Sequence, residues 1–492
     1  MATSNSPGSS SSQLLNSDPP PKINLLTMFR LGLFQMGLGI MSILTLGVLN
    51  RIMIKELAIP ATLVAGTIAM HQFVAPARLW FGQLSDAKPL RGYHRSGYVW
   101  IGTALFAIAS FLAVQATWQL SNSLAVSGWT ITTYGWVGLL AGIFALYGLA
   151  LSSSSTPFAA LLVDVSDEDN RSKLVGIVWS MLMVGIVVGA IISARLLPAP
   201  ATCQEAVGPV ISLYNRPDQL AFLQTSINRL FLLMPAAVFG LSVLSIVGIE
   251  KKYSRYTSRS MLVNREDKIT LPRAIKVLTA SRQTGLFFTF LLVMTISLFM
   301  QEAVMEPYGG EVFGMCVSDT TRLNAFWGTG TLVGISSTGF LIVPRLGKQK
   351  TAQLGCLTVA ISLGLVIISG FTANPRLLQG SLLVFGLASG ITTTGAISLM
   401  LDLTAAETAG TFIGAWGLAQ ALARAVATVS GGAVLDVGKQ LFSQPVLSYG
   451  LVFTLQAVGM ILAIWFLSRV DVAEFQTNAK QAIASVLESE LD

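Results

Sequence analysis

Long runs of apolar residues, separated by short polar segments, make up most of this 492-residue chain. A helix of roughly 20 apolar residues is long enough to cross the hydrocarbon core of a bilayer. The pattern therefore predicts an all-α membrane protein with twelve transmembrane helices, whose limits are good to about four residues. The predicted spans are 28–49, 60–82, 97–117, 134–156, 173–197, 228–249, 285–303, 323–343, 351–372, 377–401, 410–435 and 447–468.

The longest polar segment between spans, 250–284, follows the sixth span and contains nine Lys or Arg residues. A long basic linker at this position predicts two bundles of six helices. The segment is either a solvated linker or a contact for anionic lipid or a soluble partner. The predicted organisation is a disordered cytoplasmic tail (1–21), an N-terminal bundle (22–249), the cytoplasmic linker (250–284), a C-terminal bundle (285–470) and a cytoplasmic tail (471–492).

Composition supports membrane insertion, because 53% of the residues are hydrophobic and only 11% are charged. Soluble proteins carry about 25% charged residues. The net charge of +7 does not indicate nucleic-acid binding, since no recognition motif accompanies it. Most Lys and Arg residues fall in alternate loops, and the positive-inside rule then places both termini in the cytoplasm.

The two halves share a spacing that indicates an internal repeat. Asp164 precedes Gly176 by twelve residues in the first half, and Asp402 precedes Gly414 by twelve in the second. Each aspartate follows a predicted span, and each glycine lies in the first few residues of the next. Parallel repeats of six spans are typical of the major facilitator fold, which we therefore predict.

The loop after the second span, "GQLSDAKPLRGYHR", resembles the major facilitator pattern G-x-x-x-D-(R/K)-x-G-(R/K)-R, with "AKPL" inserted. The corresponding loop of the second half, "PRLGKQK", keeps the basic part. Charge pairs here can join neighbouring spans in one conformation, although ordinary basic loops remain the alternative. The candidate switch residues are Gly82, Asp86, Arg91, Arg95, Asp164, Arg171, Arg345, Gly347, Lys348 and Asp402.

Apart from charged residues within three positions of a predicted end, three His or Arg residues fall inside predicted spans, where charge is costly and usually functional. His71 is near the middle of the second span, and Arg78 follows seven residues later, on the same helix face. Pro76 lies between them and is expected to kink the helix. Arg78 either snorkels or pairs structurally, or it serves a substrate. Arg424 is too deep to snorkel, and its partner must be on another helix or be a ligand.

The three cysteines, Cys203, Cys316 and Cys356, form no metal-binding or disulfide pattern. Cys203 and Cys316 fall on the same predicted side, so a bond between them is an alternative to two unpaired thiols, which we predict. No HExxH, P-loop or nucleophile-elbow motif is present, and we therefore expect no enzyme activity.

Several stretches together resemble one family over roughly residues 22–470. They include "APARLWFGQLSD" (75–86) and "QEAVMEPYGGEVFGMCVSDTTRLNAFWGTGTLVG" (301–334). The run E-P-(Y/F)-G-G-x-x-F-G followed by T-x-L-x-A-F-W-G is not a general facilitator feature. The chain is similar to the PucC/LhaA-like bacteriochlorophyll-delivery (BCD) family, a branch of the major facilitator superfamily.

The resemblance implies a membrane factor that handles or delivers chlorophyll or bacteriochlorophyll to light-harvesting or photosystem polypeptides. It implies a thylakoid, cytoplasmic or intracytoplasmic membrane of a phototroph. With a chlorin as ligand, His71 becomes a candidate axial ligand to its magnesium. Glu302 and Glu306 become candidates for pigment or partner contact at the outer surface. A secondary transporter of a tetrapyrrole or another small anion is the alternative.

Overall fold

The computed structural model describes residues 22–90, 92–166, 168–197, 217–254, 282–402 and 409–471. Within these ranges the chain is helical, apart from short connections and one isolated bridge between Leu90 and Tyr93. Arg91, Cys203, both predicted tails except Asp471 and most of the predicted linker lie outside the described residues. The side chains of Asp86, Arg171 and Asp402 do as well.

The first group of helices runs from Leu25 to Tyr253. Its opening helix continues through two π-helical segments, and its second helix is broken. The elements are α1 (Leu25–Ser42), η1 (Ile43–Leu49), η2 (Ile52–Glu56), α2 (Ala61–Phe73), α3 (Ala77–Ala87), α4 (Ser96–Ser127), α5 (Ile131–Val165), α6 (Glu168–Leu196), α7 (Pro217–Ile246) and α8 (Ile249–Tyr253).

The second group runs from Arg282 to Ser468. Its first helix is also followed by a short 3₁₀ segment and a separate helix. The elements are α11 (Arg282–Phe299), η6 (Met300–Ala303), α12 (Met305–Phe313), α13 (Val317–Ser337), η7 (Thr338–Ile342), α14 (Val343–Leu346), α15 (Lys348–Phe371), α16 (Pro375–Asp402), α17 (Ala409–Leu441) and α18 (Pro445–Ser468).

Ten helical segments in the described residues are long and apolar enough to cross a membrane. The all-helical membrane fold is therefore confirmed, whereas the count of twelve is not. The predicted second span is divided into α2 and α3. The predicted eighth span, 323–343, is less apolar because it contains Asn324 and many Gly, Ser and Thr residues.

Several helices extend more than four residues beyond their predicted ends. The first span reaches Glu56, α4 reaches Ser127 and α5 reaches Val165. The predicted limits there are wrong because hydropathy detects only the part of a helix that crosses the apolar core of the bilayer. Backbone hydrogen bonding continues the helix into polar surroundings once it has formed.

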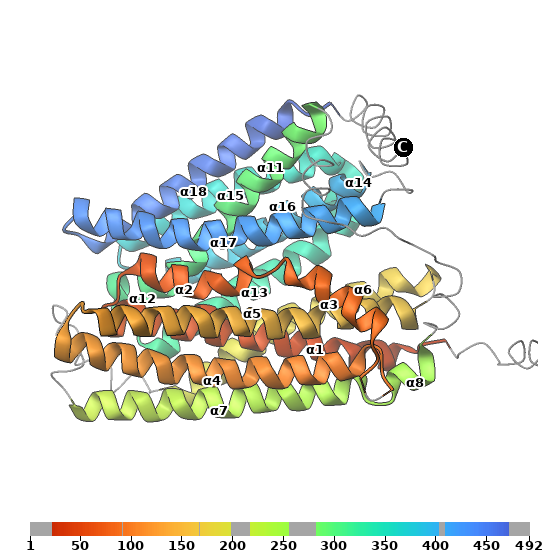
Figure 1. Ribbon diagram of the computed structural model, residues 1–492. Coiled ribbons are helices and arrows are strands. Elements are labelled where there is room, and N and C mark those ends of the chain that lie inside the picture. The colour runs from red at the N-terminus through yellow and green to blue at the C-terminus, as the bar shows by residue number, and fades with distance from the viewer. Residues whose placement is uncertain are drawn as a thin grey trace, which may run out of the picture.

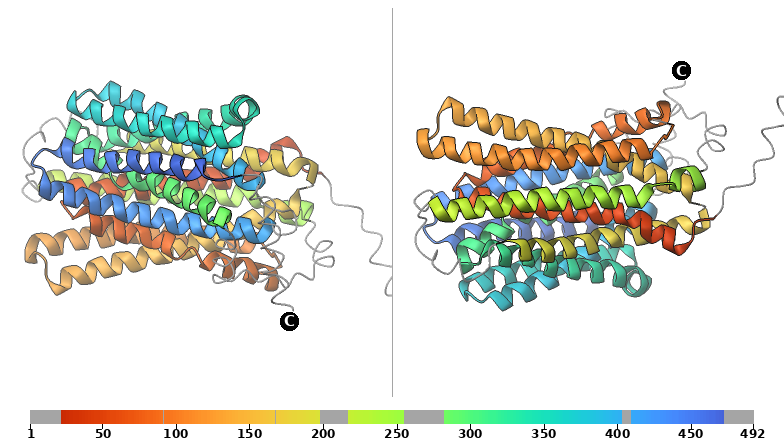
Figure 2. Two further views of the ribbon diagram at one scale, coloured as in Figure 1. Left: turned by 90° about the horizontal axis from the view of Figure 1, so that it is seen from above. Right: turned by 90° about the horizontal axis from the view of Figure 1, so that it is seen from below.

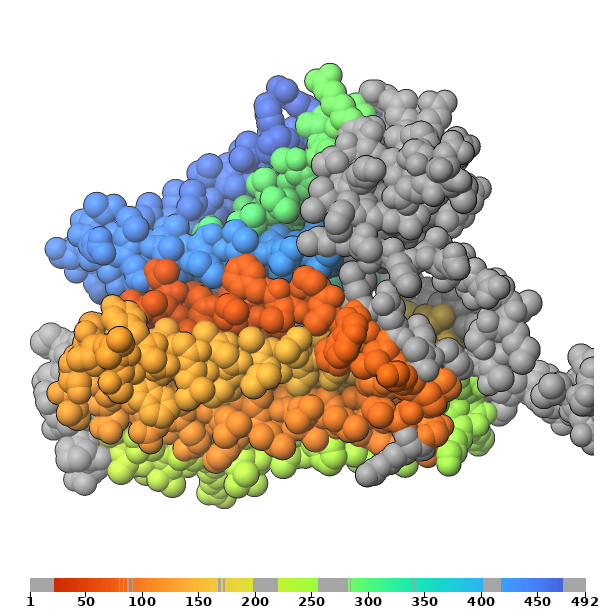
Figure 3. Space-filling model, in the orientation of Figure 1, coloured from red at the N-terminus to blue at the C-terminus, as the bar shows by residue number. Residues whose placement is uncertain are grey.

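The two groups meet along two helix pairs, in which α2 packs against α17 and α6 packs against α13. In Figure 1 the blue α17 lies directly beside the orange α2, and Figure 2 shows the same bundle from its two other sides. In the space-filling view of Figure 3 their atoms touch. We call the end where α1 begins and α18 ends the terminal end, and the opposite end the far end. The groups diverge toward the terminal end (Figure 1).

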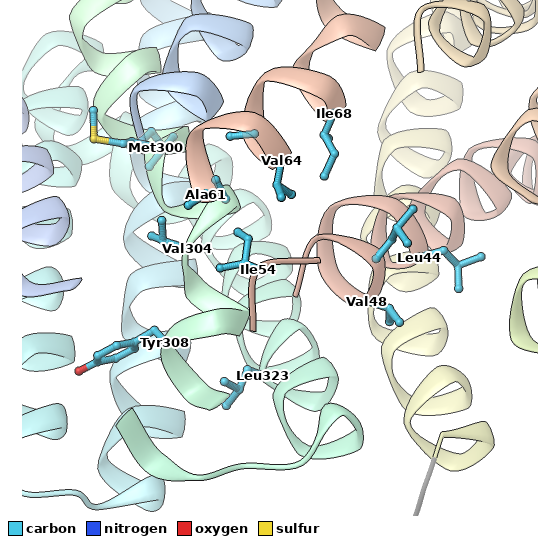
Figure 4. Close-up of a cluster of buried hydrophobic side chains, with 14 of the residues drawn as sticks. Leu44, Val48, Ile54, Ala61, Val64, Ile68, Met300, Val304, Tyr308 and Leu323 are labelled. Atoms are coloured by element: carbon cyan, nitrogen blue, oxygen red, sulfur yellow. The ribbon is translucent and has the colours of Figure 1, made fainter. Parts of the chain in front are cut away.

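A continuous apolar core crosses the interface between the groups. Leu44, Val48 and Ile54 of the first group and Val304 and Leu323 of the second belong to one buried cluster. Figure 4 shows these side chains converging where η1 and η2 approach α12 and α13. This packing holds the polar interface residues in place.

Helices α1 and α6 approach each other closely because both carry glycine at their crossing. A Cβ added to Gly185 would overlap the carbonyl oxygen of Met36, and one added to Gly39 would overlap that of Leu182. Small residues allow such backbone contacts between membrane helices. Gly39 and Gly185 are therefore packing positions.

We expect Gly185→Ala to lower the free energy of unfolding by about 1–3 kcal/mol, because the extra methyl group must displace α1. The matched control is Gly142→Ala, where no atom lies within 4 Å of the added Cβ. Denaturation in detergent, followed by tryptophan fluorescence, measures both variants. Equal stability of the two would contradict the close approach.

Candidate functional site between the two helix groups

Arg51 joins the two groups at the far end. Its side chain is only 1% exposed, although it lies in the first helix of a membrane bundle. Its guanidinium donates to the carbonyl oxygens of Met315 (2.8 Å) and Cys316 (2.7 Å) and to the hydroxyl of Thr320. It also forms a 3.2 Å ion pair with Glu56. One cation thus binds three groups of the opposite helix group.

Three further polar contacts reinforce this closure. Asn50 Nδ2 donates to the carbonyl of Ala303 (2.8 Å), and Lys55 Nζ donates to that of Gly310 (2.7 Å). The carboxylate of Asp436, on α17, accepts from the backbone N–H groups that open α2 at 2.7 and 3.0 Å. An anion at a helix N-terminus is favourable. The hydrogen bonds that join the groups therefore concentrate at the far end, which is closed.

A cavity of about 80 Å³ lies between the groups, inward from this closure. Pockets for small organic ligands usually measure roughly 300–1,000 Å³. The cavity accommodates a few water molecules in this conformation, and not a tetrapyrrole. Its lining is Ser42, Ile43, Leu46, Gly47, Ile186, Gln301, Glu302, Met305, Glu306, Leu323, Asn324, Trp327, Leu382, Phe385 and Arg424.

Arg424 and Glu302 form an ion pair on the wall of this cavity. Arg424 Nε donates to Glu302 Oε2 at 3.0 Å, and Nη2 donates to Oε1. The Arg424 guanidinium carbon lies 4.4 Å from the centre of the Phe299 ring, within cation–π range. The partner of Arg424 therefore lies on another element, η6, in agreement with the prediction that it is not on the same helix.

Glu306 also lines the cavity, and its side chain is buried. Its Oε1 accepts from Asn324 Nδ2 and faces Gly47, whose missing side chain leaves the carboxylate room. Its Oε2 has no hydrogen-bond partner in the structure. Glu306 is 3% exposed and the Glu302 side chain 10%. Their expected place at the outer surface is wrong, because α12 folds inward between the groups.

His71 lies at the end of α2, just before the break. Pro76 is the N-cap of α3, and the chain leaves helical hydrogen bonding over Val74–Pro76, so the expected kink is present. His71 Nδ1 lies 2.5 Å from the carbonyl oxygen of Ile68. A carbonyl can only accept, so Nδ1 carries the proton and Nε2 keeps a lone pair. The ring meets Tyr147 edge to face, with 6.0 Å between centroids.

Arg78 follows the break, in the first turn of α3. The break ends the continuous helix on which the predicted common face of His71 and Arg78 depended. Helix α2, which carries His71, packs against α17, which carries Arg424. The side chain of Arg78 is exposed.

A second charged cluster lies at the terminal end, within the first group. Arg95 Nε pairs with Asp164 at 3.0 Å, and its Nη1 donates to Ser85 Oγ at 2.6 Å. Glu250 accepts from the backbone N–H of Arg95 (3.0 Å) and of Ser96 (2.6 Å), at the start of α4. Two candidate switch residues, Arg95 and Asp164, therefore contact each other directly across neighbouring helices.

The two basic loops share a backbone feature. Gly92 (φ 81°) and Gly347 (φ 76°) both adopt a positive φ, which favours glycine. Gly82 lies within α3, and Arg345 lies in α14 with its side chain exposed. Lys348 opens α15. A switching role for these residues stays a prediction.

Cys316 is disulfide-bonded, whereas Cys356 is a free, buried thiol. The prediction that Cys316 is unpaired is therefore wrong. Cys203, the remaining cysteine, lies outside the described residues. Hydropathy carries no information on thiol pairing, which depends on how the loops meet in space. Among the described residues, no group of three or more His, Cys, Asp or Glu side chains could hold a metal ion.

Sequence reasoning missed three residues of this interface, Arg51, Asn324 and Asp436, and it also missed Glu250 in the charged cluster at the terminal end. The first three sit at or beyond the predicted ends of spans, where a polar residue is ordinary. The sequence gives little indication of their role, since Arg51, like Lys55, looks like any basic residue of an outer loop. Only packing buries Arg51 completely.

A family model described as "PUCC protein" matches residues 48–475. The chain belongs to the PUCC protein family. This match covers η2, the broken second helix, most of the cavity lining and the whole of the second helix group. The membership suggested by the stretches 75–86 and 301–334 is confirmed.

Curated relatives of PUCC type align over most of both chains. The "Bacteriochlorophyll synthase 44.5 kDa chain" of Rhodobacter capsulatus is 28% identical over 446 residues, which cover 89% of this chain and 94% of the relative. "Protein PucC" of the same organism is 27% identical over 459 residues, covering 90% and 92%.

Solved structures show the fold. The nucleoside transporter NupG matches with a TM-score of 0.63 at 12% identity, covering 91% of this chain and 99% of NupG. An inward-facing, unoccupied bacterial homologue of the human lysosomal transporter Spinster matches with a TM-score of 0.60 at 11% identity, covering 93% and 97%. This PUCC family member thus has the major facilitator transporter fold.

Proposed function

We propose that this chain is a non-enzymatic membrane factor that handles or delivers chlorophyll-type pigment to light-harvesting or photosystem polypeptides. The observation that carries the proposal is the PUCC match over residues 48–475. It is supported by a full-length relative whose name contains bacteriochlorophyll, although that name also calls it a synthase. The expected setting is a photosynthetic membrane, with both termini cytoplasmic.

His71 supplies one specific support for pigment binding. Its Nδ1 donates a hydrogen bond to a backbone carbonyl. The Nε2 of the neutral ring then keeps a lone pair of the kind that binds metals. We propose it as an axial ligand to the magnesium of a chlorin. The central cavity is too small for the macrocycle, so we place the pigment outside that cavity, beside the break in the second helix.

Secondary transport of a tetrapyrrole or another small anion is the second candidate function. The transporter fold and the closed far end favour it, since alternating access requires an interface that closes at one end at a time. The two functions differ in their products: transport moves a solute between compartments, whereas delivery ends with pigment on a polypeptide.

Affinity purification of the full chain in mild detergent, with an absorption spectrum and identification of bound polypeptides, tests the proposal. We expect a chlorin band and an antenna or photosystem polypeptide with the wild type. We expect a much weaker band with His71→Ala and an unchanged one with His94→Ala, the chain's other histidine. Pigment-free wild-type protein, together with normal antenna assembly in a deletion strain, would overturn it.

A further inference from the structure

Glu306 is a buried carboxyl group without a compensating charge. Its side chain lies on α12 and is 3% exposed, and its Oε2 is buried with no hydrogen-bond partner. Among the described residues, Asn324 Nδ2 alone donates to the group, at Oε1. A carboxylate taken out of water without a paired cation is so costly that the group normally becomes neutral instead. These surroundings therefore favour the protonated form of Glu306.

The charged groups on the elements around Glu306 all have other partners. Helix α12 packs against η6, η2, α13 and α18, and α18 carries no charged residue. In the described part of the chain, every other charged side chain of these elements and of the neighbouring α17 is engaged. The contacts are Glu302–Arg424, Arg51–Glu56, Asp319–Arg322, Glu311–Lys439, Lys55 with the carbonyl of Gly310, and Asp436 with the N-terminus of α2.

A proton fits this position better than a metal ion does. A Cβ added to Gly47 would overlap Oε1 of Glu306, and Asn324 Nδ2 already binds the same oxygen. Oε2 is itself buried, so no free space adjoins it. A magnesium or calcium ion takes about six or more oxygen ligands around it. A proton balances the charge of the carboxylate and needs no such space.

The cavity between the helix groups gives this proton a way in and out. Glu306 lines the cavity together with the polar side chains of Ser42, Gln301 and Asn324. The volume of about 80 Å³ is enough for a few water molecules. Water in this space lies against the wall that carries the carboxyl group, and a proton released there has an acceptor within the protein.

The charge of Glu306 also bears on the closure at the far end. Gly310 follows Glu306 by one helical turn and lies against Arg51, since a Cβ added to Gly310 would be 3.0 Å from Arg51 Nη2. Arg51 donates to the carbonyl oxygens of Met315 and Cys316, which joins the groups. To pair with an ionised Glu306, the guanidinium would have to leave these oxygens. Ionisation of Glu306 therefore works against the closed interface.

We propose that Glu306 is a proton-binding residue of the interface, which holds one proton while the far end is closed and releases it to water when the two helix groups separate. On release the carboxyl O–H bond breaks, and the electron pair stays on the carboxylate. The inference goes beyond the proposed function, because it requires no pigment. The closed conformation binds one proton more than the open one, so raising the pH favours opening by up to about tenfold per pH unit.

Infrared spectroscopy of the purified full chain in dodecyl maltoside, a detergent without a carbonyl group, tests the site. At neutral pH we expect the wild type to show the carbonyl stretch of a protonated carboxyl group, with a downshift in heavy water. Glu306→Gln should lose this band, and Glu306→Asp should move it. Glu311→Gln, on the same helix, is the matched control and should retain the band, because Glu311 is paired with Lys439.

Hydrogen–deuterium exchange measures the link to opening, with each rate divided by that of the unfolded chain at the same pH. We expect the protection of η2 and α12 to fall with rising pH in the wild type and to stay constant in Glu306→Gln, since glutamine imitates the neutral carboxyl. An equal pH dependence in both proteins overturns the proposed release on opening.

Three outcomes of the infrared measurement overturn the site itself. The first is a wild type without the band at neutral pH, and the second is a band that persists in Glu306→Gln. The third is loss of the wild-type band when sodium replaces choline in the buffer, which would show that Glu306 binds a metal ion instead of a proton. None of these measurements uses pigment, so their failure leaves the proposed function untouched.

Discussion

Replacing Arg51 with methionine will separate the two helix groups at the far end. Methionine fills a similar volume, but it removes the hydrogen bonds to Met315, Cys316 and Thr320 and the ion pair with Glu56. Removing one partner of a buried ionic network typically costs about 3–5 kcal/mol. Because the hydrogen bonds join opposite helix groups, their loss destabilises the conformation in which the far end is closed.

Hydrogen–deuterium exchange in nanodiscs measures this opening. We expect faster exchange in peptides covering η2 and α12 and unchanged exchange in α8, which lies at the terminal end of the first group (Figure 1). The reducing agent tris(2-carboxyethyl)phosphine should be included in one series, because the disulfide of Cys316 also restrains this end of the molecule.

Arg30→Met is the matched control. Arg30 donates to the carbonyl oxygens of Leu244 (2.7 Å) and Val247 (2.5 Å), so it also binds backbone, but within the first helix group. It should affect α7 locally and leave η2 and α12 unchanged. If Arg51→Met and Arg30→Met gave the same exchange pattern, Arg51 would not be the residue that closes the interface.

Replacing Glu302 with glutamine will destabilise the protein by about 3 kcal/mol, at the low end of the range for a broken buried pair. The low end is appropriate because the Arg424 side chain is 36% exposed to the cavity. Arg424 would then lie against the Phe299 ring without its carboxylate partner.

The double variant Glu302→Gln/Arg424→Met completes the cycle. Because both charges are removed together, we expect it to recover most of the stability that Glu302→Gln loses. Unfolding in detergent monitored by tryptophan fluorescence gives the coupling energy. Additive losses in the double variant would exclude a direct stabilising interaction.

An exposed pair supplies the control for this cycle. Arg322 and Asp319 are 3.8 Å apart on α13, with side chains 53% and 34% exposed. Exposed pairs contribute about 0–1 kcal/mol, so Asp319→Asn should change stability by less than 1 kcal/mol. A larger loss of stability in Glu302→Gln than in Asp319→Asn would then be due to burial of the ion pair and not to the removal of a charge alone.

Ionisable residues inside apolar runs were the candidates that the sequence marked most clearly. His71, Arg78 and Arg424 stand out because each interrupts such a run, and their role in a site stays a prediction. The roles of Glu302 and Glu306 were harder to place. Both occur at a predicted loop, and only the inward course of η6 and α12 turns them toward the cavity.

The sequence by itself determined the class of fold, because apolar runs long enough to span a bilayer have few other solutions. It also determined family membership, through the specific run beginning at Glu306. Tertiary structure alone decided the partners: Arg424 with Glu302, Arg51 with three groups of the opposite bundle, and Cys316 with a disulfide. Hydropathy measures how one segment partitions into lipid, whereas these contacts depend on how segments more than a hundred residues apart approach one another.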